Sequence, residues 1–202
     1  ILHGSFERDE DGLGIGLDFL PSSIRFNSKE WSFEPSELFY KNNDLDVKTF
    51  ALVSGNERIS IEGKASQEKA DTLNLNMEHF DISIVDHILK QDFGTKGLAT
   101  GTVQLTSPLK DKGILIDMIC DSTSFASTPL GILNIGSRWN DADKDFEIFV
   151  RNDLEGKNNI NAYGTLKPDG GLLDITADLD RLDVSYAHPF LDEIFSEMDG
   201  KI

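Results

Sequence analysis

Hydrophobic and polar residues alternate along most of this chain. In one stretch Leu73, Leu75 and Met77 are separated by Asn74 and Asn76. Because successive side chains of a β-strand point to opposite faces of the sheet, a period of two predicts strands with one apolar and one polar face. Such strands are typical of antiparallel sheets that expose one face to water. The sequence therefore predicts a mainly β fold.

The same alternation recurs further along the chain, and turn residues separate the runs. Glycine-containing stretches at 54–56, 155–157 and 168–171 predict turns between strands. The apolar positions of the alternating runs are predicted to line one open sheet face. These candidate lining residues are Leu73, Leu75, Met77, Ile114, Ile116, Met118, Phe146, Ile148, Val150, Leu173, Ile175 and Leu179.

Two segments have a helical rather than a strand period. Residues 84–90 would place Ile84, Val85, Ile88 and Leu89 on one side of a helix. Residues 188–196 show similar spacing, and Pro189 suits the first helical turn. We therefore expect two short amphipathic helices.

The two predicted helices follow similar stretches of sequence, which indicates an internal repeat. Residues 56–63 are similar to residues 157–164, so that Gly63 and Gly164 occupy matching positions. The repeat predicts one unit at 1–97 and a second at 98–202, each ending in a short helix. Because strand-like patterns reach both ends of the sequence, we expect the chain to be a fragment of a larger protein.

Composition narrows the possible partners. The chain of 202 residues has a formal net charge of -17 and is 39% hydrophobic. An acidic surface repels nucleic acid and is not drawn to anionic lipid head groups, so contact with lipid would be made through acyl chains. Cys120 is the only cysteine, which excludes an intramolecular disulfide.

Three stretches could suggest specific sites, and each is better explained by structure. Glycines at 12–16 are followed by an alternating strand and lack the helix that a phosphate-binding loop needs. Acids at 141–145 begin like a calcium loop, but Phe146 stands where that loop needs glycine, so we expect an acidic hairpin turn. Nothing in the sequence makes His79 and His87 converge on a metal. We expect no catalytic centre, metal or cofactor.

The order of these segments is similar to that found in a known protein family. A strand ending in glycine at 59–63 precedes the alternating strand at 73–77. An aromatic residue or leucine followed by an acid then leads into the predicted helix, as at 80–83, and residues 182–185 repeat this step. This arrangement resembles the repeating block of TamB-type translocation and assembly proteins, which belong to the AsmA-like group of β-groove proteins.

The resemblance implies a fold, a location and a function. It implies a long, curved antiparallel sheet of the β-groove or taco-like kind, in the periplasm of a Gram-negative bacterium, within a protein anchored in the inner membrane. It implies a non-enzymatic segment whose apolar groove binds phospholipid acyl chains and carries phospholipid between the inner and outer membranes.

Two other functions are left open by the sequence. The alternative that the resemblance implies is a scaffold or chaperone for translocation and assembly of outer-membrane proteins such as autotransporters. A partner of the outer-membrane assembly-barrel type would then act through regions outside this chain. The third possibility is a purely structural stalk. In every case exposed strand edges favour dimerisation of the isolated chain.

Overall fold

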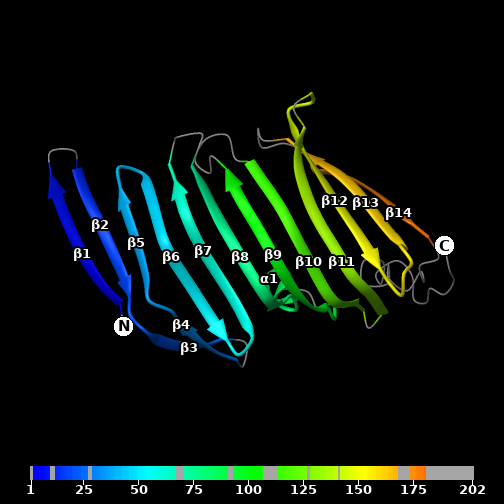
Figure 1. The fold of residues 1–202 in the computed structure, drawn as a ribbon, viewed down its shortest axis with the longest axis horizontal. Coiled ribbons are helices and arrows are strands. Elements are labelled where there is room, and N and C mark those ends of the chain that lie inside the picture. Colours follow the sequence, from blue (N-terminus) through cyan, green and yellow to red (C-terminus); the bar gives the residue numbers. More distant parts are fainter. Residues whose placement is uncertain are drawn as a thin grey trace. The chain divides into compact units, whose positions relative to one another are not determined.

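The strands in the described part of the chain pair into one open antiparallel β-sheet, and Figure 1 labels them. The computed structural model describes residues 2–9, 12–26, 29–66, 71–90, 93–106, 113–126, 128–140, 142–167 and 173–180. The first eight strands are β1 (Leu2–Asp9), β2 (Gly12–Phe19), β3 (Ser22–Phe26), β4 (Lys29–Phe33), β5 (Ser36–Lys41), β6 (Asp44–Ser54), β7 (Glu57–Ala65) and β8 (Thr72–Asp81). After the helix α1 (Ile84–Leu89) come β9 (Lys96–Thr106), β10 (Gly113–Phe125), β11 (Thr128–Asn140), β12 (Asp145–Asp153), β13 (Ile160–Leu166) and β14 (Leu173–Leu179).

Most strands pair with their neighbours in the sequence. The strand order in the sheet is β1-β2-β5-β6-β7-β8-β9-β10-β11-β12-β13-β14, with β3 and β4 beside this path. Tight turns make such pairing possible. Asn42 and Asn43 both have positive φ, at 52° and 69°, in the two-residue turn between β5 and β6. Asparagine tolerates this conformation, which hairpin turns of two residues require.

The chain divides into two compact units. Unit 1 consists of Ile1–Phe80 and Gly101–Ile116, and unit 2 consists of Asp81–Thr100 and Asp117–Ile202. The strands β9 and β10 therefore contribute residues to both units.

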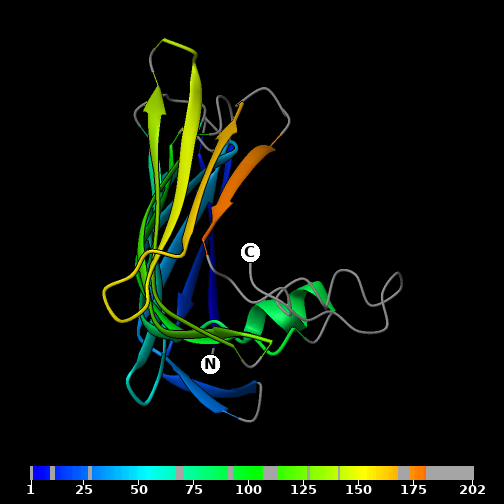
Figure 2. The same cartoon turned by 90° about the vertical axis from the view of Figure 1, so that its right-hand side faces the viewer.

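Two prolines bend the strands of unit 1. Leu20 and Pro21 separate β2 from β3, and Glu34 and Pro35 separate β4 from β5. Because proline has no backbone N–H to donate, both bends interrupt the ladder of hydrogen bonds. The β3–β4 hairpin turns away from the strands β2 and β5 that it extends (Figure 2). One hydrogen bond of 3.0 Å, from the Glu34 backbone N–H to the Ala51 carbonyl oxygen, anchors the bend.

The predicted strands are confirmed. Of the two predicted helices, only the first lies among the described residues. Every alternating run singled out in the sequence lies in a strand. The structure has one helix of six residues, α1, at the first predicted position, and the second, at 188–196, lies outside the described residues. The turns at 54–56 and 155–157 lie between strands, and the turn at 168–171 lies outside the described residues.

The structural explanations of two motif-like stretches are also confirmed. Residues 12–16 lie in β2, where they pair with β1. The acidic stretch at 141–145 connects β11 to β12, and Asn140 pairs with Asp145 across this hairpin.

Candidate functional site

In unit 1 the antiparallel register places the predicted lining residues of β8 on one face of the sheet. Leu75 and Met77 lie opposite Ile61 and Ile59 of β7, and Leu73 lies further along the same row. Residues directly opposite each other in an antiparallel pair point to the same face. The alternation therefore produces a continuous apolar surface over these two strands.

The registers of β2, β5 and β6 extend this surface to residues that the predicted lining left out. These residues continue the same alternation of apolar and polar positions, so the pattern that identifies them was present in the sequence. The sequence does not reveal the strand order, which places β5 beside β2. Together with the residues of β7 and β8 they form the apolar face of unit 1, and the additional members are Leu13, Ile15, Leu17, Phe19, Leu38, Tyr40, Leu45, Val47, Phe50 and Leu52.

In unit 2 a second apolar face is formed in the same way. Ile148 lies opposite Ser137 and Gly164, and Val150 lies opposite Ile135 and Ala162. The registers of β10 to β14 define the apolar face of unit 2. Its apolar residues are Met118, Cys120, Leu133, Ile135, Trp139, Phe146, Ile148, Val150, Ile160, Ala162, Leu166, Ile175, Ala177 and Leu179.

The remaining predicted lining residues are placed less fully. Ile114 and Ile116 are half-buried and lie two residues apart in β10, so they point to the same side of that strand. They belong to unit 1, whereas Met118 of the same strand belongs to unit 2. Leu173 occupies the register position opposite Leu166.

Neither apolar face is fully covered by protein in the described part of the chain. Ile175 is 57% exposed and Leu179 is 43% exposed, while Leu75 and Ile148 are half-buried. The buried hydrophobic residues are Trp31, Val47, Ala51, Ala65, Ala99, Cys120, Leu130 and Phe146. Contiguous apolar surface of this kind marks a binding surface for a ligand or a partner.

The opposite faces of the same strands are mainly polar and carry ion pairs. In unit 1 Lys64 lies 3.4 Å from Asp46, and Lys48 pairs with Glu37. The hydrogen bond to Glu37 raises the pKa of Lys48. In unit 2 Arg138 pairs with Glu147. These exposed pairs contribute little to stability, but they keep this side of the sheet in water.

Aromatic rings close one end of the apolar face in unit 1, at the proline bends. The rings of Phe19, Phe33 and Phe50 pack against one another, with centroid distances of 5.7 Å from Phe19 to Phe33, 5.2 Å from Phe19 to Phe50 and 5.8 Å from Phe33 to Phe50. Trp31 of β4 is 6% exposed and lies 6.0 Å from Phe80. The aromatic corner, defined as these five residues, attaches the β3–β4 hairpin to unit 1.

One polar side chain is buried within the apolar face of unit 2. Asn152 is 1% exposed and lies opposite Leu133. Its amide donates a hydrogen bond of 3.0 Å to the Leu130 carbonyl oxygen, and its Oδ1 accepts from the backbone N–H groups of Asn159 and Ile160 at 2.8 and 2.7 Å. A buried amide with these partners is satisfied, so it fixes the loop before β13.

Cys120 lies on the same face and is 2% exposed. Burial raises the pKa of its thiol, with a smaller contribution from the charge of Asp121. The thiol is therefore protonated at neutral pH and poorly reactive.

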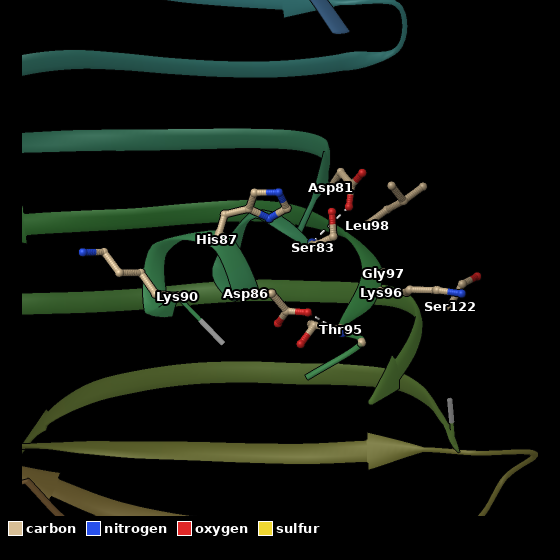
Figure 3. Close-up of a pocket in the computed structure, with 11 residues that line it drawn as sticks. Asp81, Ser83, Asp86, His87, Lys90, Thr95, Lys96, Gly97, Leu98 and Ser122 are labelled. Atoms are coloured by element: carbon tan, nitrogen blue, oxygen red, sulfur yellow. Dashed lines mark hydrogen bonds between the residues drawn. The ribbon is translucent and has the colours of Figure 1, made fainter. Parts of the chain in front are cut away.

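A cavity of about 890 Å³ lies beside α1 in unit 2 (Figure 3). Its lining includes carboxylates, lysines and a histidine, and none of these was predicted as a site residue from the sequence. Their spacing matches no known motif, because the end of β8, α1 and the start of β9 approach each other only in the fold. The charged or titratable lining residues are Asp81, Asp86, His87, Lys90 and Lys96.

Within the ranges that the structure describes, no three His, Cys, Asp or Glu side chains are grouped so that they could hold a metal ion. No helix in the described part of the chain has the length and apolar character needed to cross a membrane.

Comparison with known proteins finds no match for this chain among family models, curated proteins or solved structures.

Proposed function

We propose that this chain provides an apolar surface on which the acyl chains of phospholipids move. The proposal rests on two properties that the same strands combine. Their apolar face is continuous, and some of its residues are open to solvent. The apolar faces of unit 1 and unit 2 are continuous over several strands, and they include exposed or half-buried residues such as Leu75, Ile148 and Ile175.

The physical driving force is burial of hydrocarbon. Each methylene group of an acyl chain that leaves water contributes about 0.8 kcal/mol. A row of Ile, Leu, Val and Met side chains provides similar contacts at every step, so that no single residue dominates. The polar face of each unit keeps the protein in water, and a head group can stay solvated while its chains lie on the sheet.

The finer architecture of the proposal is a curved β-groove built from two repeats. Matching registers support the repeat. Gly63 lies opposite Leu73 in the β7–β8 pair, and Gly164 lies opposite Ile175 in the β13–β14 pair. The sequence similarity aligns Gly63 with Gly164. The boundary between the two sequence repeats, which falls between residues 97 and 98, and the helix at 188–196 remain part of this proposal.

The cellular setting of the proposal rests on the resemblance to TamB-type proteins. In this setting the chain is a non-enzymatic segment of an envelope protein that is anchored in the inner membrane and spans the periplasm. Its role is phospholipid transport between the inner and outer membranes.

A second candidate function is a scaffold or chaperone for outer-membrane proteins. It is favoured by the strand β1, which pairs with β2 alone among the described strands. Phe6 of β1 is 74% exposed. A client strand could add to such an edge through backbone hydrogen bonds, and the apolar face would then bind alternate side chains of the client.

Photo-crosslinking to lipid tests the acyl-chain proposal. A photoreactive residue is placed at Ile175 and, as its matched control, at Thr176, which is also exposed but lies on the opposite face. A second pair, Ile61 and Glu62, tests unit 1 in the same way. We expect phospholipid adducts, detected by mass spectrometry, from Ile175 and Ile61 but not from Thr176 or Glu62.

The same experiment separates the two candidate functions. Equal lipid labelling from both faces would overturn the acyl-chain proposal. Protein adducts from a photoreactive residue at Phe6, with no lipid adducts from Ile175 or Ile61, would favour the scaffold function instead.

A further inference from the structure

The cavity beside α1 is lined by a buried carboxylate, and only one of its two oxygens has a hydrogen-bond partner among the described residues. Asp86 is 8% exposed. Its Oδ2 accepts a hydrogen bond of 2.9 Å from the Thr95 backbone N–H, whereas its Oδ1 has no hydrogen-bond partner among the described residues. Leaving a buried charged acceptor without a partner is unfavourable, so a donor that reaches Oδ1 from the cavity would satisfy it.

The other carboxylate of the cavity is already engaged. Asp81 Oδ1 accepts a hydrogen bond of 3.0 Å from the Ser83 backbone N–H. Asp86 is therefore the acceptor that the cavity offers to a ligand. Figure 3 shows the Asp86 side chain extending from α1 towards Thr95.

The cavity also carries positive charge. Lys90 and Lys96 both line it, and neither forms an ion pair with a side chain that the structure describes. In Figure 3 the two lysines lie on opposite sides of Asp86. Leu98, which is 39% exposed, adds an apolar wall. A ligand that fits these groups carries a cation, an anion and an apolar part.

We propose that this cavity binds the primary ammonium group of a zwitterionic phosphoethanolamine head group. The ammonium donates a hydrogen bond to Asp86 Oδ1, and the adjacent phosphate is attracted by Lys90 or Lys96. A quaternary ammonium has no N–H to donate, and a glycerol head group has no positive charge. The inference rests on the proposed function, because it names the class of phospholipid that the apolar faces would carry.

Binding of short-chain lipids tests the inference. The full chain is titrated, with calorimetric detection, with dihexanoyl phosphatidylethanolamine, phosphatidylcholine and phosphatidylglycerol. Free glycerophosphoethanolamine is the probe for a head group without acyl chains. We expect phosphatidylethanolamine to bind about tenfold more tightly than the other two lipids, which is the effect of one charge-assisted hydrogen bond.

Variants assign the preference to the cavity. Asp86→Asn should lower the affinity for phosphatidylethanolamine to that for phosphatidylcholine. Asp117→Asn, the same change at an exposed position of β10, should leave the preference unchanged. Lys96→Gln should weaken all three lipids to a similar extent, because all three contain a phosphate. If Asp86→Asn fails to fold by circular dichroism, the comparison of lipids on the unaltered chain decides alone.

The outcomes distinguish this inference from the proposed function. Equal binding of the three lipids, or a preference that survives in Asp86→Asn, overturns the head-group site and leaves the acyl-chain proposal standing. Binding of glycerophosphoethanolamine that is as tight as that of the lipid, and lost in Asp86→Asn, supports an ammonium site but contradicts an acyl-chain surface. Absence of binding by all four ligands overturns both.

Discussion

At the scale of single residues, backbone conformation and close approach set the strictest demands. Gly131 in β11 has a φ of +76°, and a Cβ at this position would lie 2.1 Å from the Asp153 carbonyl oxygen. Gly156, in the turn after β12, also has a φ of +76°, but a Cβ there would meet no atom within 4 Å. The two glycines thus share the same φ, whereas their surroundings differ.

We predict that Gly131→Ala destabilises the chain far more than Gly156→Ala. A left-handed conformation costs an L-residue roughly 1–2 kcal/mol, and this is the cost expected for Gly156→Ala. At Gly131 the backbone around Asp153 must also move, which adds about 1–3 kcal/mol. Urea denaturation of both variants measures the difference. Equal losses of unfolding free energy would show that the carbonyl oxygen moves aside easily.

At the scale of elements, the β3–β4 hairpin is held to unit 1 by different interactions on its two sides. The aromatic corner packs on the apolar face, where Trp31 is buried against Phe80. Partly buried ion pairs lie on the other side, where Arg58 donates a hydrogen bond of 2.9 Å to Glu34 at the bend and Lys29 pairs with Glu57. Buried aromatic area contributes far more than an ion pair in water.

Replacing one group on each side of the hairpin tests this ranking. Trp31→Ala is expected to lower the unfolding free energy by about 3–5 kcal/mol, because it removes a large buried side chain. Arg58→Met removes the ion pair to Glu34 but leaves the pair between Lys29 and Glu57, and it should cost about 1 kcal/mol or less. Hydrogen exchange of the β4 amides should accelerate only in Trp31→Ala. Faster exchange in Arg58→Met would mean that the ion pairs hold the bend.

At the scale of the whole molecule, the open sheet has two ends. β1 pairs only with β2, and β14 only with β13, among the described strands. An edge strand presents unpaired backbone groups to any second chain. The net charge of -17 opposes association, whereas exposed apolar residues such as Phe6 favour it.

We predict that the isolated chain associates in a concentration-dependent way and that Phe6→Lys weakens this association. A charge on an edge strand blocks the approach of a second edge. Tyr40→Lys is the control, because Tyr40 is 43% exposed on the apolar face of unit 1 but lies in β5, which has a neighbour on each side. Sedimentation velocity measures both variants. An equal effect of Tyr40→Lys would place the contact on the apolar face rather than on the edge.

The sequence by itself determined which residues share a face. The period of two is a property of the extended backbone, so Leu73, Leu75 and Met77 fall on one side of β8 whatever pairs with that strand. The same reasoning puts Phe146, Ile148 and Val150 on one face of β12, where each lies opposite other residues of the apolar face of unit 2, although Phe146 is buried rather than open.

Only the tertiary structure decided which strands are neighbours, how far each face is covered and where charges converge. Pro21 and Pro35 mark the two bends locally, but the pairing of β5 with β2 depends on contacts between distant residues, which no local pattern specifies. The burial of Asp86 in a cavity beside α1 depends on the same kind of contact. Local periodicity fixes the direction of a side chain, whereas its surroundings depend on the path of the whole chain.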